Sequence, residues 1–344
     1  MALTASGTIK YSEIIAEFGT PSSGGLGEFR LSENVGTLTN LPLDTGVPQS
    51  GQIKFSDFYS KKLNHVVDLY SIGNSTTRQN AKDRWSNGNV HIVGSTKTGK
   101  TQPPDTVEDR VIINVNATIA SAKGTQTHCA LRTGNWDSNT TLEIEIGTSG
   151  KLYGSGGDGG TGGSANETAG TDGQTGSSAL GIQYPCTVNN LGVIQSGYGG
   201  GGGGGGNTRT TGGGKKSGAT TNGSSGGGGG GGAGSPAGDA GGVQTPLAVG
   251  GGSAGSAGAA GSLSNLVSGA GTGGAGGSEA GDGGNASAVN NSATKADDGT
   301  SPSGAAGGGT GGDNGYAIIT NQGSAPSVTG NSATGRIITS TNPT

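Results

Sequence analysis

Glycine recurs at every third position through the middle of this chain, and this spacing constrains the fold more than any other feature. Glycine fills 79 of the 344 positions, and 60 of them lie between Gly154 and Gly315. The spacing is clearest over 154–163, 252–261 and 271–277. A polyproline-II helix has three residues per turn, so a glycine at every third position leaves one bare edge along which another backbone can approach. We therefore expect 154–315 to form a stack of polyproline-II helices joined by backbone hydrogen bonds.

Two other structures are compatible with a glycine-rich segment. Composition favours a disordered linker, because glycine loses the most backbone entropy on ordering. A linker, however, has no reason to keep a three-residue register or to enclose apolar islands such as 180–182 and 263–267. A collagen triple helix also has period three, but here the register breaks repeatedly and the whole chain holds only 11 prolines. The stacked helices remain the prediction.

Two internal repeats organise the rest of the chain. Residues 6–14 reappear 44 positions later as 50–58, and each copy has a Gly-x-Ile-x-aromatic run followed by a serine and an acid that can cap a short helix. We expect the two copies to pack on each other. In the second repeat, 141–157 and 186–200 both consist of a strand, a turn, a short apolar strand and a glycine run.

The apolar pattern outside the glycine-rich part indicates strands. They are expected at 90–93, 111–115, 117–120 and 142–146, separated by turn signals, and an antiparallel β-sandwich is the simplest arrangement of them. A further strand is expected at 316–320.

The predicted fold class is mainly β with a glycine-rich polyproline-II helix sandwich and a small N-terminal α+β module. The sequence divides into four units. These are an N-terminal module at 1–64, the β-sandwich at 65–153, the glycine array at 154–315 and a C-terminal β segment at 316–344.

Charge and hydropathy exclude several classes of function. The net charge is −4, and the glycine-rich part carries nine acidic against four basic residues, so no electrostatic footprint for nucleic acid or an anionic membrane is present. The sequence shows neither a run of about 18 apolar residues nor a signal peptide. We expect a soluble product of a cytoplasm, with Cys129 and Cys186 as free thiols.

One motif suggests nucleotide chemistry. Residues 94–101 match the phosphate-loop pattern letter for letter. Pro103 and Pro104 follow at once, and they disfavour the helix whose N-terminal amides would face the phosphates. The sequence therefore predicts a surface loop here.

Metal sites are also not expected. Residues 308–313 fit the start of a calcium β-roll repeat, but Gly315 stands where a large apolar residue is required. His65, His91 and His128 lie in separate segments without metal-ligand spacing. We predict no catalytic residue, no metal and no cofactor, and hence a protein that is not an enzyme.

Two of these patterns resemble known virion proteins. The Ser-Gly-x-Ile-x-aromatic-Ser-acid motif near the N-terminus, ending in Phe55-Ser-Asp-Phe-Tyr59, resembles the opening module of bacteriophage tail-fibre and baseplate-associated proteins. The passage from strand to glycine run resembles the long-tail-fibre tip adhesins of T-even-like phages. In that family, a rigid glycine stack carries variable loops that contact a receptor on the host surface.

The resemblance implies a receptor-binding role for the non-glycine interruptions of the array, at 207–211, 215–225, 244–247 and 289–301. The candidate receptor-binding residues are Asn207, Thr208, Arg209, Thr210, Lys215, Lys216 and Gln244. Implied partners are other virion tail or baseplate proteins, through 1–64, and a host-surface glycan or outer-membrane component. A homotrimer is compatible with a fibre, and the implied location is the virion, at the tail fibre or tail tip.

Two alternatives stay open. The glycine-rich segment holds no Phe or Trp and only Tyr184 and Tyr198, although aromatic side chains usually anchor tight protein interfaces. This scarcity is compatible with a structural virion component that bridges or decorates other proteins without touching the host. A glycine-rich polyproline-II bundle could also present a regular Thr/Ala face to ice.

Overall fold

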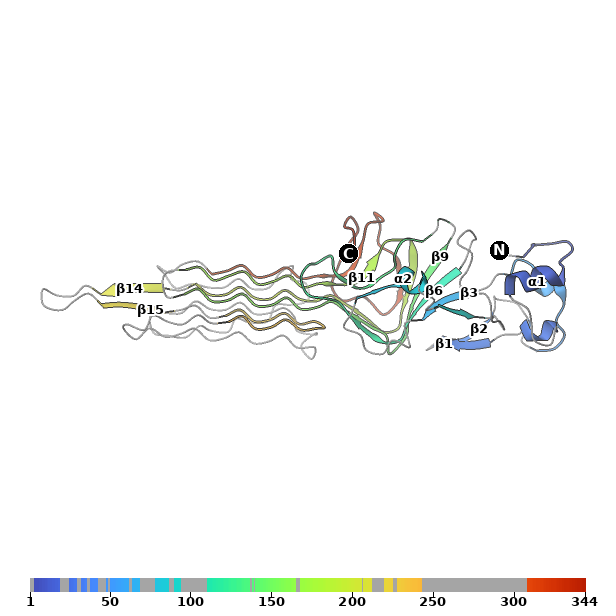
Figure 1. Cartoon of the computed structure of the whole chain (residues 1–344), viewed down its shortest axis with the longest axis horizontal. Helices are drawn as coiled ribbons and strands as arrows, with labels where there is room; N and C mark the ends of the chain where they lie inside the picture. The colour runs from blue at the N-terminus through green and yellow to red at the C-terminus, as the bar shows by residue number, and fades with distance from the viewer. Residues whose placement is uncertain are drawn as a thin grey trace, which may run out of the picture.

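The structure is a computed structural model that describes most of the chain outside 243–307. The described residues are 3–18, 25–29, 32–35, 38–42, 48, 50–61, 64–68, 78–86, 90–93, 110–136, 138, 140–164, 168–205, 207–211, 220–224, 228–242 and 308–344. Figure 1 shows the helical N-terminal segment at one end, the sheets in the middle and the glycine-rich runs extending away from them.

The N-terminal segment packs its two repeat copies around one small core. Its elements are α1 (Tyr11–Phe18), the 3-10 helices η1 (Leu26–Phe29) and η2 (Phe55–Phe58), and the paired strands β1 (Ser32–Val35) and β2 (Leu38–Pro42). Ile14 from the first copy and Phe58 from the second are fully buried in the same cluster. The acid of each copy accepts a hydrogen bond from the backbone N–H three residues earlier. The expected packing of the copies is confirmed.

Three mostly parallel sheets form the centre of the molecule. The first sheet has the order β17-β12-β9-β6-β3-β5, the second β13-β10-β7 and the third β18-β16-β11-β8-β4. Within these three sheets, the only antiparallel pair among the described strands is β3 with β5. The strands are β3 (Asn64–Asp68), β4 (Gln79–Asn80), β5 (Val90–Val93), β6 (Arg110–Val115), β7 (Thr118–Ala120), β8 (Cys129–Arg132), β9 (Thr141–Ile146), β10 (Lys151–Tyr153), β11 (Ser178–Ile182), β12 (Cys186–Asn190), β13 (Val193–Gln195), β16 (Tyr316–Thr320), β17 (Ser327–Gly330) and β18 (Arg336–Ile338).

The chain visits the three sheets in rotation and so winds as a coil. Strands β6, β7 and β8 belong to the first, second and third sheet, and β9, β10 and β11 repeat that order, as do β12, β13 and β16. Each turn of the coil adds one strand to each sheet beside its predecessor. The helix α2 (Ala81–Ser86) contacts β3 and β4.

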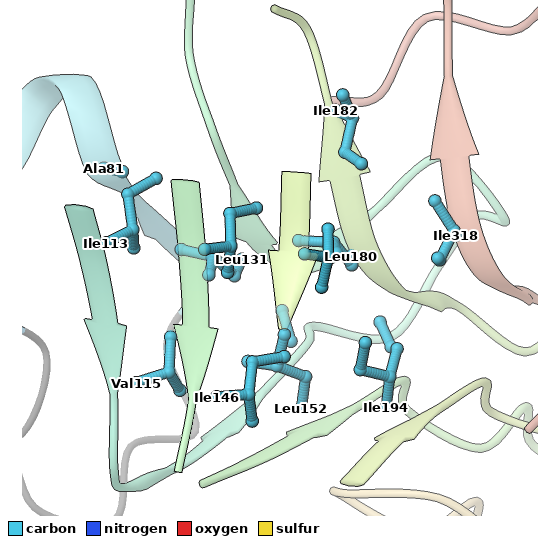
Figure 2. Close-up of a cluster of buried hydrophobic side chains, with 14 of the residues drawn as sticks. Ala81, Ile113, Val115, Leu131, Ile146, Leu152, Leu180, Ile182, Ile194 and Ile318 are labelled. Atoms are coloured by element: carbon cyan, nitrogen blue, oxygen red, sulfur yellow. The ribbon is translucent and has the colours of Figure 1, made fainter. Parts of the chain in front are cut away.

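Like residues stack at equivalent positions of successive turns and form one core. In the first sheet Ile113 pairs with Ile144, which pairs with Val188. The second sheet aligns Ile119, Leu152 and Ile194, and the third aligns Leu131, Leu180 and Ile318. All nine side chains belong to one buried cluster, and Figure 2 shows members from the three sheets converging. Stacking of this kind lets short strands bury a continuous apolar interior.

The predicted fold class, mainly β with a polyproline-II sandwich and an α+β module, is wrong. Mostly parallel sheets with few helices make up the regular structure, and β6 and β9 of the expected antiparallel β-sandwich pair in parallel. Apolar alternation locates a strand but carries no information on the direction of its neighbour. Paired residues of the parallel strands can be far apart in the sequence: Leu180 pairs with Ile318, and the glycine-rich segment lies between them along the chain.

The glycine-rich runs leave the coil at one corner, between the second and third sheets. This corner is short between β7 and β8, whereas glycine runs fill it after β10 and after β13. The described runs at 154–163, 170–177, 197–205, 228–242 and 308–315 lie side by side and are joined by backbone hydrogen bonds. The strands β14 (Asn207–Thr211) and β15 (Thr220–Ser224) form a separate antiparallel hairpin.

Candidate functional site

Four of the seven predicted receptor-binding residues lie in one strand. Asn207, Thr208, Arg209 and Thr210 belong to β14, which pairs residue by residue with β15, from Asn207 opposite Ser224 to Thr211 opposite Thr220. The sequence suggested an interruption without regular structure, and the structure forms a hairpin instead. Figure 1 shows this hairpin at the end of the glycine runs that lies away from the sheets.

The remaining predicted residues cannot be placed with the hairpin. Lys215, Lys216 and Gln244 lie outside the described residues, as do most of 215–225 and all of 244–247 and 289–301. The hairpin strands are therefore the described part of the candidate site.

The run that leads from β13 to the hairpin is held by neighbours on several sides. Gly200 and Gly203 donate to the carbonyls of Gln174 and Thr171, and Gly201 donates to Gly230. These hydrogen bonds recur every three residues, in keeping with the glycine period. The backbone of 197–205 is buried throughout.

At most of the described contacts between the runs only glycine fits. A Cβ atom on Gly200 would lie 2.0 Å from the carbonyl oxygen of Asp158, and one on Gly203 would lie 2.0 Å from that of Thr161. Distances this short exclude any side chain unless the backbone moves. The glycine spacing in the sequence is thus a packing requirement of this assembly.

Hydroxyl groups bond across two antiparallel runs. The Oγ atoms of Ser155 and Ser177 lie 3.0 Å apart, and Thr161 Oγ1 lies 2.9 Å from Thr171 Oγ1. Ser155 and Thr161 take non-glycine positions in the triplets of 154–163, and Ser177 and Thr171 belong to the run at 170–177. These hydroxyl groups therefore provide hydrogen-bond partners for one another and reinforce the backbone hydrogen bonds between the two runs.

An ion cluster joins the base of the runs to the coil. Lys123 Nζ, in the short corner after β7, lies 2.6 Å from Asp158 Oδ1 and 2.8 Å from Asp239 Oδ2. Burial lowers the pKa of Lys123, but hydrogen bonds and charge from the two aspartates outweigh that effect and leave the pKa raised. Sequence reasoning missed this cluster, because its members are 35 and 116 positions from Lys123 and share no motif.

The two tyrosines of the glycine-rich segment do not lie in the hairpin. Tyr198 is only 2% exposed at the start of its run. Tyr184 follows β11 and donates its hydroxyl hydrogen to the Thr140 carbonyl oxygen over 3.0 Å. Neither side chain can anchor a partner at the far end of the runs.

Neither cysteine has the properties of a nucleophile. Burial raises the pKa of both Cys129 and Cys186 to about 12, so the thiols stay protonated near neutral pH. Both are free thiols, as expected. Cys186 lines a shallow cavity of about 190 Å³ at the corner between β11 and β12, beside Gln322 and Pro326.

Two other motifs have chemical associations, and the structure describes only one of them. The phosphate-loop match at 94–101 falls outside the described residues. In 308–313, Gly309 and Gly312 pack against the carbonyls of Thr171 and Gln174, as members of the glycine runs. Among the residues that the structure describes, no three His, Cys, Asp or Glu side chains gather as metal ligands.

Comparisons with known proteins add no assignment. No family model, curated protein or solved structure matches this chain. Within the described parts of the chain, no helix is both long and apolar enough to span a membrane.

Proposed function

We propose that this chain is a bacteriophage virion protein of the tail fibre or tail tip that displays the β14–β15 hairpin for recognition of a host surface. The observation that carries the proposal is the position of the hairpin at the far end of hydrogen-bonded glycine runs (Figure 1). The N-terminal repeat segment at the opposite end would attach the protein to other tail or baseplate components. No catalytic step is part of this proposal.

The mechanism is rigid display. Because 197–205 is buried and bonded to neighbouring runs, the hairpin base is ordered before any partner arrives. Preordering reduces the conformational entropy that binding would otherwise cost. Several copies around a symmetric tail would add avidity to weak single contacts. Polar Asn, Thr and Arg side chains suit a glycan or a polar outer-membrane component.

The test uses the full chain, fluorescently labelled, on a panel of bacterial cells. In one variant a short Gly-Ser turn replaces 207–224, whose end residues Asn207 and Ser224 are paired and therefore close enough to be bridged. We expect the intact chain to bind a subset of strains and the variant to lose that binding. Thr310→Ala, at an exposed position along the side of the runs, is the matched control and should bind normally.

Immunogold labelling of virions with antibody against 154–344 locates the protein independently. Label at distal fibre tips supports host recognition. Binding to cells that survives removal of the hairpin would contradict the role given to β14 and β15.

A structural role without host contact is the second candidate. It is favoured by the buried position of Tyr198 and by the absence of Phe and Trp from the glycine-rich segment. Label on the capsid, tail tube or baseplate body, together with no binding to any cell, would support this candidate over the first.

A further inference from the structure

A short segment after β18 lies against the third sheet. Figure 1 shows it, at the label C, beside β11. The backbone N–H of Thr341 donates to the Thr320 carbonyl oxygen over 3.2 Å. The N–H of Thr344 donates to the Thr127 carbonyl oxygen over 2.8 Å. Thr320 ends β16, whereas Thr127 precedes β8, and β11 is the strand between these two in the sheet. We call 341–344 the strap, because it joins strands from different turns of the coil.

A glycine in β11 makes room for the strap. A Cβ atom on Gly181 would lie 2.6 Å from Pro343 Cβ and 2.8 Å from Cys129 Sγ. Pro343 is buried in this Gly181 slot, whereas Asn342 and Thr344 on either side of it are exposed. Cys129 is fully buried. Because the Pro343 ring and the Cys129 thiol lie against the same point of the backbone, the ring is part of the cover of the thiol.

The other described contacts of the strap lie mostly at the surface. Arg78 Nη1 donates to the Thr344 main-chain oxygen over 3.1 Å, and Thr344 Oγ1 lies 2.8 Å from Thr127 Oγ1, both at exposed positions. Gln183 Nε2 lies 3.4 Å from the Pro343 carbonyl oxygen. Few buried apolar contacts and exposed hydrogen bonds are properties of segments that open locally. The strands beneath the strap, in contrast, are held by the buried core cluster that all three sheets share.

We propose that 341–344 is a strap that opens and closes over the Gly181 slot as one unit, while the coil beneath it stays folded. In the closed state, the strap fastens the corner before β8 to the end of β16, and so joins a segment that precedes the glycine-rich part to one that follows it. In the open state, the slot and the Cys129 thiol face solvent, and the stacked rows of the core remain packed. The proposal is independent of the recognition role.

Thiol labelling of the full chain tests the strap, because modification of Cys129 reports its opening. In the wild type at pH 8 we expect slow labelling of Cys129, with a rate that changes little in urea below the unfolding transition, because local opening exposes little new surface. Mass spectrometry of the peptide that contains Cys129 measures the rate. A rate that rises with urea as steeply as global unfolding would mean that only the unfolded coil exposes the thiol, and this result would overturn the proposal.

Replacing Pro343 by glycine removes the ring from the slot. Pro343→Gly should raise the labelling rate of Cys129 at least about tenfold, which corresponds to about 1.4 kcal/mol of closing free energy. Asn342→Gly is the matched control, because it also places a glycine in the strap but at an exposed position. Its rate should stay within about twofold of the wild type. Cys186, in β12, is the internal reference, and its rate should be the same in all three chains.

Circular dichroism and thermal unfolding establish that each variant is folded. Equal labelling rates of Cys129 in the wild type and in Pro343→Gly would overturn the proposal. So would a Pro343→Gly chain in which Cys129 and Cys186 are labelled faster by the same factor, because that result would mean that the whole coil had loosened.

Discussion

At the residue scale, burial is the main cause of the pKa shifts of individual side chains. The two thiols show this most directly, because both pKa values are raised to about 12 without help from a neighbouring acid. Lys123 shows the opposite balance, since its two aspartate partners outweigh the effect of burial.

The raised thiol pKa values predict slow alkylation. At pH 8 the buried Cys129 should not react with a thiol reagent within minutes in the folded protein, and the half-buried Cys186 should react more slowly than a free thiol, because the thiolate is the reactive species. In guanidinium both should react fully. Mass spectrometry after timed quenching counts the modified thiols, and rapid labelling of the native protein would contradict the burial described here.

The ion cluster of Lys123 predicts a defined pH dependence. Because the folded-state pKa lies above the usual value of 10.5, the stabilisation is present below pH 10.5 and is lost as the pH rises through the folded-state pKa. Lys123→Met should therefore lower Tm at pH 7, with the difference from wild type shrinking above pH 10.5. Lys10→Met, at an exposed position, is the control and should leave Tm unchanged at both pH values. An equal deficit at pH 7 and pH 11 would show that the charge is irrelevant.

At the scale of elements, glycine runs and short strands obey different packing rules. The strands stack side chains in register, whereas the runs bring backbone against backbone. The strand positions expected from apolar patterning are confirmed with small shifts: 90–93 is β5, 142–146 lies within β9 and 316–320 is β16.

Close backbone packing predicts a position-specific cost for alanine. Gly200→Ala places Cβ against the Asp158 carbonyl and should destabilise the protein by about 1–3 kcal/mol or more. Gly242→Ala meets nothing closer than Thr161 Cγ2 at 3.8 Å, so its effect should stay within about 0.5 kcal/mol. Chemical denaturation of the two variants measures the difference. Equal tolerance of both would argue against the packing of the runs.

The hydrogen bonds between runs predict amide protection. Gly156 and Gly159 donate to Pro236 and Asp239, while Gly157 and Gly160 donate to Tyr198 and Gly201. These amides should exchange far more slowly than in the denatured chain, as followed by mass spectrometry. Complete exchange within the dead time would mean that 154–163 behaves as a linker.

At the scale of the whole molecule, the coil is completed by segments far apart in the chain. Strand β16 returns after the long insertion to pair with β11, and β17 pairs with β12. The segments 65–153 and 316–344 therefore contribute strands to the same sheets.

Because 65–153 and 316–344 contribute strands to the same sheets, we expect the two segments to unfold together. Ile318→Ala should cost about 2–5 kcal/mol and lower the stability of the whole coil, because Ile318 packs in the row of Leu131 and Leu180. Leu180→Ala combined with it should be non-additive, since the residues are paired. Leu191→Ala, at a half-exposed site, should cost little. A separate unfolding transition for 316–344 would contradict this account.

The sequence by itself determined the features that depend on local pattern. Glycine spacing indicated backbone contact between runs, the repeat at 6–14 and 50–58 indicated the N-terminal core, and alternation located the strands. Such patterns depend on residues close together in the chain, so local propensity and periodicity reveal them.

Tertiary structure alone decided the parallel pairing, the hairpin of β14 and β15, and the ion cluster of Lys123. The physical reason is that strand direction and partner choice follow from which apolar rows can stack into one core. The residues that stack, such as Leu180 and Ile318, are 138 positions apart in the sequence. The glycine-rich segment between them contains no pattern that predicts this contact.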